Sequence, residues 1–189
     1  MTRTATGPEG WRPLAAEDLP GLDALAAVVH PGFFERPEVM AERLALFAQG
    51  CLALPGRAGA ERLSGYVLSH PARLGAPPPL DTLLGRLDPQ ADALYLHDIA
   101  LGPECRGRGL AAEAIERILD LGRRYPAVML ISVYGTAPFW SRFGFSDETA
   151  SARPEKLAPY GPYARYMVRR TEGFRPGVDE ASATEVQEG

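Results

Sequence analysis

A turn with two glycines and two arginines is the part of the sequence best suited to bind an anion: Arg106-Gly107-Arg108-Gly109-Leu110-Ala111. It lies between an apolar stretch, 93–101, and an amphipathic helical pattern that begins at Leu110. Glycine lets the backbone approach a ligand closely, and the first amides of a helix have no partner inside it. Together with the helix dipole and the guanidinium groups, these amides favour a pyrophosphate. A solvated surface loop is the alternative.

The same glycines also fit part of a dinucleotide-binding fingerprint, as Gly107-x-Gly109-x-x-Ala112. However, residues 102–105 separate the predicted strand from the glycines, whereas the dinucleotide turn is tight. The next predicted strand ends in Ser132-Val133-Tyr134, with no carboxylate to bind ribose hydroxyls. Hydride transfer is therefore not expected.

The elements expected around this turn make a mixed α/β chain. Apolar spacing predicts helices over 22–29, 38–47, 110 to about 121–124, and 137–142. Strands are expected over 11–14, 51–54, 63–69, 93–101, 128–134 and 166–169. The proline-rich segment 71–90 is expected to be a connecting insertion that holds a short helix over 80–87. A strand-turn-helix-strand unit in the middle predicts an α/β or α+β sandwich.

Composition and charge fit a globular protein without a polyanionic partner. The 189 residues are 46% hydrophobic and 23% charged, and 20 basic against 24 acidic residues give a net charge of -4. Neither nucleic acid nor a membrane is expected as a partner. Cys51 and Cys105 lie far apart without a metal-ligand neighbour, so no metal site is expected. With no leader or membrane-length apolar run, a cytoplasmic protein is expected.

The two ends of the chain differ from its middle in composition. Residues 1–10 are small and polar, and 171–189 are acidic and small, with almost nothing to bury. We therefore expect a flexible N-terminus over 1–10, one domain over 11–170 and a disordered tail over 171–189.

Two stretches resemble the GNAT superfamily of acetyl-CoA-dependent N-acetyltransferases. Residues 99–103, Ile-Ala-Leu-Gly-Pro, followed by the turn 106–111, are similar to the family's R/Q-x-x-G-x-G/A motif after a strand that ends in a V/L-x-P type turn. Residues 137–145, Ala-Pro-Phe-Trp-Ser-Arg-Phe-Gly-Phe, are similar to its Phe-Tyr-x-x-x-Gly-Phe segment. Residues 96–101, Leu-His-x-x-Ala-Leu, and 138–145, Pro-Phe-x-x-Arg-Phe-Gly-Phe, also resemble arylalkylamine N-acetyltransferases locally. Two motifs in the family's order are more specific than either alone.

The resemblance implies a mixed, mostly antiparallel central sheet flanked by helices, whose middle strands splay apart to admit acetyl-CoA. The strand backbone at 99–101 would pair with the pantetheine and polarise the thioester carbonyl, which is the preorganised electrostatics that acyl transfer needs. The amides over 107–112 would hold the pyrophosphate. The implied cofactor-binding residues are Ile99, Ala100, Leu101, Arg106, Gly107, Arg108, Gly109, Leu110, Ala111, Ala112, Phe139 and Trp140.

An amine acceptor must lose a proton, because with a pKa near 10.4 only about one lysine-like amine in two thousand is neutral at pH 7. A histidine base can contribute roughly 10² to 10⁴ in rate. The arylalkylamine resemblance implies that His97 is this base, and a core histidine is the alternative. Strict alternation along 93–101 would put Tyr95, His97 and Ile99 on one face and Asp98 on the other. Asp98 is then a second candidate base that cannot orient His97, with a structural hydrogen bond as its alternative role.

The family's general acid has no direct counterpart. Trp140 stands where the family has the tyrosine that returns a proton to the CoA thiolate, and Ser132 stands where related ribosomal-protein acetyltransferases carry a glutamate. Tyr134 is the candidate catalytic substitute, and the loop tyrosines are further ones: Tyr160, Tyr163 and Tyr166. The thiolate can also leave unassisted.

The sequence thus predicts an acetyltransferase, monomeric or homodimeric, that moves acetyl from acetyl-CoA to the primary amine of a small molecule by direct attack in a ternary complex. The residues expected to bind the acceptor are His30, Phe33, Tyr95 and Tyr160. One alternative is a protein or peptide acetyltransferase that acts on an N-terminus or a lysine. Another is a non-catalytic acyl-CoA-binding module.

Overall fold

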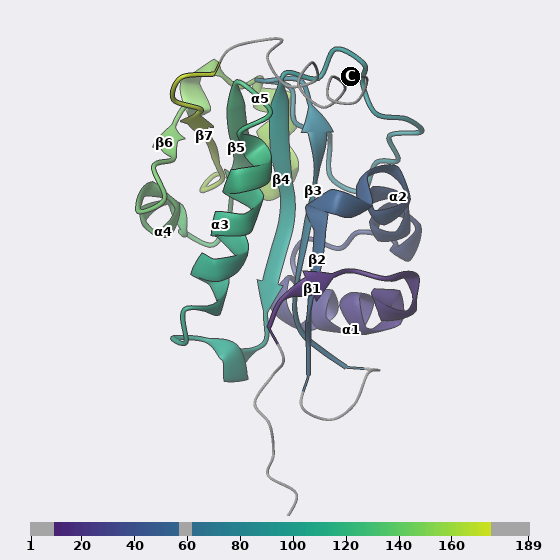
Figure 1. Ribbon diagram of the computed structural model, residues 1–189. Coiled ribbons are helices and arrows are strands. Elements are labelled where there is room, and N and C mark those ends of the chain that lie inside the picture. Colours follow the sequence, from purple (N-terminus) through teal and green to yellow (C-terminus); the bar gives the residue numbers. More distant parts are fainter. Residues whose placement is uncertain (1–9, 57–61, 175–189) are drawn as a thin grey trace, which may run out of the picture.

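The computed structural model describes residues 10–56 and 62–174, and its centre is a seven-stranded sheet (Figure 1). The strand order is β1-β2-β3-β4-β5-β7-β6. The strands are β1 (Arg12–Pro13), β2 (Cys51–Pro55), β3 (Leu63–Ala72), β4 (Ala93–Leu101), β5 (Ala127–Ser132), β6 (Ser146–Asp147) and β7 (Arg165–Arg170). Only β4 and β5 pair in parallel among these neighbours of the described chain, so the predicted mixed, mostly antiparallel sheet is confirmed.

Helices cover both faces of the sheet, α1 and α2 on one side and α3 and α4 on the other (Figure 1). The α-helices are α1 (Leu19–Val29), α2 (Pro37–Phe47), α3 (Leu110–Gly122), α4 (Ala137–Ser141) and α5 (Pro154–Leu157). Short 3-10 turns occupy Ala16–Asp18, Ala48–Gly50, Pro103–Cys105, Thr149–Ser151 and Ala158–Tyr160. No helix in the described ranges is long and apolar enough to cross a membrane. The predicted terminal segments fall largely on 1–9 and 175–189, outside the described residues.

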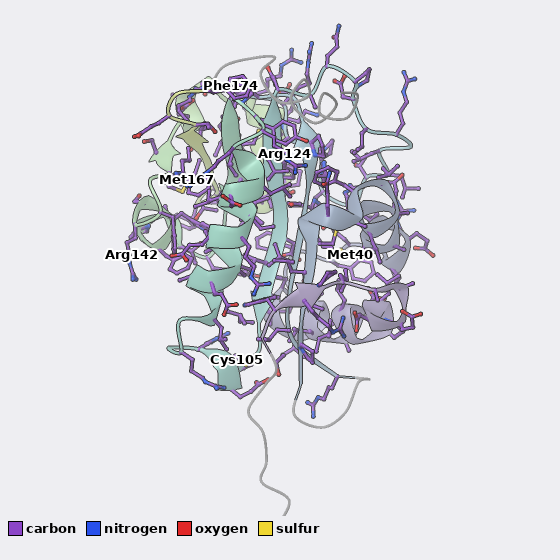
Figure 2. All side chains as sticks on the ribbon, in the orientation of Figure 1. Met40, Cys105, Arg124, Arg142, Met167 and Phe174 are labelled. Atoms are coloured by element: carbon purple, nitrogen blue, oxygen red, sulfur yellow. The ribbon has the colours of Figure 1, made fainter. Side chains whose placement is uncertain are left out.

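Amphipathic spacing explains why α3 forms where it does. Ala114, Ile115 and Ile118 are buried against the sheet, whereas Glu116 and Asp120 are exposed on the opposite side. The helix ends at Gly122, where an added Cβ would lie 2.3 Å from Val128 Cγ2. Side chains fill the space on both faces of the sheet (Figure 2): Met40 belongs to the apolar cluster under α1 and α2, and Met167 to the cluster under α3.

The insertion between β3 and β4 contains no helix, so the helix predicted over 80–87 is wrong. The Glu42 side chain accepts hydrogen bonds from Leu84 N at 2.7 Å and Gly85 N at 2.8 Å. Gly85 has a φ of 70° and Asp81 a φ of 53°, both in the left-handed region that a helix cannot use. The backbone groups of this loop are thus satisfied by α2 instead of by a helical ladder.

Strands β4 and β5 pair over only half of β4. Their parallel register runs from Ala93 opposite Ala127 to Leu96 opposite Leu130, and β4 continues to Leu101 with β3 as its partner. The strands therefore separate beyond Leu96, which confirms the splayed middle strands predicted from the resemblance.

A β-bulge interrupts β4 at the point where this splay begins. Leu68 pairs with Asp98 but the next residue, Ser69, pairs with Leu96, so His97 is an extra residue on β4. Leu96 and Ile99 consequently contact the same cluster, under α3. The predicted strict alternation is wrong, because the bulge changes the phase of the strand and lets His97 and Asp98 both reach toward α1 and α2.

Candidate active site

A pocket of about 980 Å³ opens at the splay of β4 and β5. Its walls come from both faces of the sheet. Arg106, Ala111, Phe139 and Trp140 line it from the α3 and α4 side, and Asp23, His30, Phe33, Glu35 and Tyr160 line it from the α1 and α2 side. A pocket lined from both faces of the sheet can receive one ligand on the side of α3, called the α3 entrance below, and a second ligand on the side of α1.

The glycine turn has the geometry of an anion cradle at the α3 entrance. Gly107 and Gly109 have φ angles of 71° and 77°, and an added Cβ at either would meet nothing within 4 Å. The first bond of α3 runs from Glu113 N to Gly109 O at 3.1 Å, so the amides of 110–112 precede the helical ladder. Arg106 lines the pocket and Arg108 is exposed beside it. These donors suit a pyrophosphate group.

The exposed edge of β4 supplies further backbone donors. Just after β4, Gly102 N donates a hydrogen bond to Ser64 O of β3 at 2.8 Å. Alternate residues of an antiparallel strand direct their amides to the same side. Ala100 is therefore paired toward β3 and buried in the cluster under α1, whereas Ile99 and Leu101 direct their polar groups into the gap and line the pocket. Ala100 is not among the pocket-lining residues.

His97 contacts a carboxylate that the sequence analysis did not single out. Its Nε2 lies 2.9 Å from Oε2 of Glu35, and the two side chains are 3% and 6% exposed. Glu35 Oε1 accepts a hydrogen bond from Asp81 N at 3.0 Å, which fixes the carboxylate. Burial raises the pKa of Glu35. The neighbouring His97 and the Asp81 amide lower this pKa by more, so its net shift is downward. His97 Nδ1 is buried without a hydrogen-bond partner in the described part of the chain.

Asp98 forms a second histidine–carboxylate pair in the same pocket. Its Oδ1 lies 3.0 Å from Nε2 of His30, and its Oδ2 accepts a hydrogen bond from the Tyr66 hydroxyl at 2.5 Å. Burial raises the pKa of Asp98, but His30 and Tyr66 outweigh it and leave the pKa below its ordinary value. Burial conversely lowers the pKa of His30, and Asp98 more than offsets this, so the net shift is upward. Each histidine of the pocket thus has its own carboxylate.

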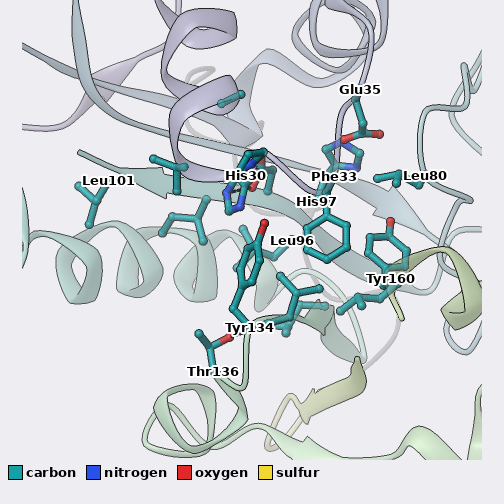
Figure 3. Close-up of a pocket in the computed structure, with 18 of the residues that line it drawn as sticks. His30, Phe33, Glu35, Leu80, Leu96, His97, Leu101, Tyr134, Thr136 and Tyr160 are labelled. Atoms are coloured by element: carbon teal, nitrogen blue, oxygen red, sulfur yellow. Dashed lines mark hydrogen bonds and ion pairs between the residues drawn. The ribbon is translucent and has the colours of Figure 1, made fainter. Parts of the chain in front are cut away.

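Aromatic rings surround these two pairs (Figure 3). Phe33 lies 5.1 Å from Tyr134 and 5.7 Å from Tyr160 between ring centroids, and Tyr134 stacks on His30 at 6.0 Å. Tyr134 has a φ of 54°, an unfavourable region for a bulky side chain that directs its ring across the pocket. The rings give the α1 side of the pocket apolar walls around a polar floor.

The tyrosines considered as a general acid differ in their surroundings. Burial raises the pKa of Tyr160 and of Tyr166, which makes both weaker acids. Tyr163 is 77% exposed and does not line the pocket. Tyr134 lines the pocket and is 57% exposed, so its hydroxyl is the best placed of the four to give a proton to a group inside.

Most residues expected at the site come together in this pocket. Those that line it are His30, Phe33, Tyr95, His97, Asp98, Ile99, Leu101, Arg106, Ala111, Tyr134, Phe139, Trp140 and Tyr160. Those outside its lining are Ala100, Gly107, Arg108, Gly109, Leu110 and Ala112. Trp140 is 7% exposed and packs against Phe139, Phe143 and Phe145.

Three residues of the site were not predicted from the sequence: Glu35, Tyr66 and Asp23. Glu35 follows the helix predicted over 22–29, in a loop without a periodic pattern, and nothing local pairs it with His97. Tyr66 lies on β3 and reads as an ordinary core residue. Only the pairing of β3 with β4 brings its hydroxyl to Asp98.

His70 is a buried histidine next to the site that predicts an unusual pH dependence of stability. Its Nδ1 lies 2.9 Å from Pro71 O, its ring centroid lies 5.8 Å from that of His97, and burial followed by the charge of His97 lowers its pKa to about 3. An unfolded histidine titrates near 6.5, so below that pH the unfolded chain binds a proton that the folded chain does not.

We expect the free energy of unfolding to fall through His70 by about 2 kcal/mol between neutral pH and about pH 5. In His70→Gln, the free energy of unfolding should fall by about 2 kcal/mol less than in the wild type over the same pH range. Urea unfolding followed by circular dichroism measures both values. His30 has the opposite sign: its raised pKa gives stability that is present below about 6.5 and is lost as the pH rises. An unchanged pH slope in His70→Gln would contradict the assignment of a neutral, buried imidazole.

Comparison with known proteins gives a family and a fold. Residues 31–145 match the sequence profile of the acetyltransferase (GNAT) family. No protein of curated function matches the sequence.

Solved structures share the fold at low sequence identity. GphF, a GNAT-like decarboxylase in complex with isobutyryl-CoA, is 18% identical with a TM-score of 0.63, covering 87% of this chain and 100% of its own. The loading GNATL domain of CurA from Lyngbya majuscula is 15% identical with a TM-score of 0.66, covering 86% and 98%. The ribosomal-protein-S18-alanine N-acetyltransferase from Escherichia coli is 15% identical with a TM-score of 0.57, covering 89% and 97%.

Proposed function

The chain belongs to the acetyltransferase (GNAT) family, a family of acyltransferases, and on that premise we propose that it transfers an acetyl group from acetyl-CoA to the primary amine of a small molecule. The observation that carries the proposal is the pocket through the splay of β4 and β5. Phosphate-binding groups lie at its α3 entrance, and two histidine–carboxylate pairs lie on its α1 side. This separates donor from acceptor and favours direct attack in a ternary complex.

The residues at the α3 entrance fit the CoA part of the co-substrate. The amides of the turn and of 110–112, with Arg106 and Arg108, would hold the pyrophosphate. The polar groups of Ile99 and Leu101 in the gap would pair with the pantetheine arm. Structural neighbours with isobutyryl-CoA or CoA bound support this assignment.

The chemistry needs a proton acceptor on the α1 side, and His97 is the residue we assign to it. Glu35 would hold Nε2–H, which leaves the Nδ1 lone pair free to take the proton from the acceptor ammonium. The amine nitrogen then attacks the thioester carbon, and a β4 amide in the gap stabilises the oxyanion. The nitrogen of the tetrahedral intermediate releases its second proton to water, the C–S bond breaks as the carbonyl reforms, and Tyr134 can protonate the departing CoA thiolate.

The acceptor side of the pocket supports a small amine over a peptide. His97 and Glu35 are almost fully buried, at the floor of a recess that Phe33, Tyr160 and Leu80 flank (Figure 3). A slender alkyl or aryl amine can reach such a floor without the open groove that a peptide backbone needs. The aromatic walls also suit an arylalkylamine-like side chain.

A decarboxylase activity like that of GphF fits the lining less well. A decarboxylase substrate brings its own carboxylate, which needs a net positive subsite. Here Glu35 faces His97 and Asp98 faces His30, so neither imidazolium would be free to bind it. The charges of this pocket favour a cation.

Two measurements test the proposal. Isothermal titration with acetyl-CoA should give micromolar binding, and a thiol-release assay should report free CoA with some members of a panel of alkyl and aryl amines but not without amine. A panel of peptides tests the peptide alternative in the same assay. Binding without release across both panels would support the non-catalytic alternative, and no binding would overturn the CoA assignment.

A further inference from the structure

One face of α1 lines the pocket over two helical turns. The lining residues of α1 and its C-cap are Asp23, Ala26, Ala27, Val28, Val29 and His30. Of these, Ala26, Ala27 and the C-cap His30 follow Asp23 at spacings of three, four and seven and share its face. A polar group thus lies at each end of a short apolar floor made by two alanines. Seven residues of helix correspond to roughly 10 Å along its axis. The pocket therefore offers a second polar position at Asp23, about two helical turns from His30.

The charges in the pocket do not balance at the Asp23 end. Three carboxylates line it, and two of them have a histidine each: Glu35 has His97, and Asp98 has His30. The Asp23 side chain has neither a hydrogen bond nor an ion pair with any residue in 10–56 or 62–174. Even with both histidines protonated, one carboxylate stays unneutralised.

The surroundings of Asp23 disfavour its negative charge, which a bound cation would stabilise. Burial and then the nearby negative charge of Glu38 on α2 raise the pKa of Asp23, and Asp23 also acts on the Tyr66 hydroxyl that binds Asp98. A bound cation would relieve this repulsion. Arg106, the cation of the pocket lining, belongs to the α3 entrance and not to this end.

An unpartnered atom on β4, next to the Asp98 that pairs with His30, also indicates a ligand. Nδ1 of His97 is buried, and no described residue hydrogen bonds to it. An amine that placed its reacting nitrogen there would leave its hydrocarbon chain over the alanines, toward Met40 and Asp23. Such a molecule would match every feature of this side of the pocket.

We propose that the acceptor is an amine with a second cationic group, which Asp23 binds about two helical turns from the nitrogen that is acetylated. This inference rests on the proposed acetyltransferase function and narrows its substrate class to dications such as diamines with a hydrocarbon spacer. Asp23 is a specificity-determining residue in this assignment. It takes no part in the transfer itself, so its loss should lower kcat/KM for a dication more than for an amine with a single charge.

The test compares diaminooctane with octylamine, which has the same chain and lacks the second ammonium. Diaminobutane, too short to span roughly 10 Å, serves as a length control. The wild-type enzyme should prefer diaminooctane over octylamine by about tenfold in kcat/KM, as expected for one partly buried charge pair. Asp23→Asn should remove this preference by raising the KM for diaminooctane. Glu116→Gln, the same charge change on the exposed side of α3, should behave as wild type.

The outcomes separate this inference from the function on which it rests. Equal kcat/KM for diaminooctane and octylamine, or an equal loss for both in Asp23→Asn, would overturn the dication inference and leave the acetyltransferase intact. No acetylation of either amine, with acetyl-CoA bound, would overturn both. A preference for diaminooctane that survives Asp23→Asn would move the second cation site elsewhere and also overturn the role of Asp23.

Discussion

His97→Gln is expected to lower the turnover of amine acetylation about 100-fold at neutral pH, within the usual contribution of a general base. Glutamine keeps a polar side chain of similar length at the bulge of β4, but it cannot accept a proton. The affinity for acetyl-CoA should not change, because the turn 106–109 and the first amides of α3 lie on the other face of the sheet. Titration calorimetry and steady-state kinetics measure the two quantities separately.

The pH profile distinguishes a base from a merely structural histidine. An acceptor amine loses its proton unaided as the pH approaches its own pKa, near 10.4 for an alkylamine. The deficit of His97→Gln should therefore shrink steadily as the pH rises. A deficit that stays constant from neutral to alkaline pH would contradict the base assignment and indicate a packing role.

Glu35→Gln is the matched control for the histidine–carboxylate pair. An amide oxygen at Oε2 can still accept the His97 Nε2–H, but the negative charge that stabilises the protonated ring is gone. We expect a smaller loss of turnover than in His97→Gln. His30→Gln, which removes the other histidine of the pocket, should cost less turnover if His97 is the base, and the reverse ranking would transfer the role to the His30–Asp98 pair.

The parts of the site that could be predicted from the sequence are those fixed by short stretches of chain. The turn 106–111 holds its glycines and its helix start within six residues, and the positive φ of Gly107 and Gly109 follows from that local pattern. The strand 93–101 was likewise predicted with its observed ends. Local spacing and turn chemistry suffice wherever the relevant neighbours are close in sequence.

What could not be predicted depends on contacts between distant segments. The bulge at His97 exists only relative to β3, where Leu68 and Ser69 face Asp98 and Leu96. A single strand sequence carries no sign of it, and the alternation rule therefore gave the wrong face. Glu35 and His97 are 62 positions apart in the chain (97 − 35). The loop that follows α1 brings Glu35 to His97.

Gly50→Ala is expected to destabilise the fold by about 3 kcal/mol, at the severe end of single substitutions, because the new methyl group has no space. Its Cβ would lie 2.5 Å from Ser69 Oγ and 2.7 Å from Ser69 O, and the latter is backbone that a rotamer change cannot move. The Ser69 hydroxyl also donates to Gly50 O at 2.8 Å. The turn that ends α2 is thus packed directly on β3.

The effect of Gly50→Ala should extend to the site, since Ser69 is the residue of β3 at which the bulge opposite His97 begins. Urea unfolding measures the loss of stability, and Gly32→Ala provides the control, because its Cβ would meet only the Tyr134 hydroxyl at 3.7 Å, an ordinary contact. If β3 yields to the methyl group, His97 moves relative to Glu35, and turnover falls while acetyl-CoA affinity is kept. A Gly50→Ala protein as stable as wild type would contradict the close packing of this turn on β3.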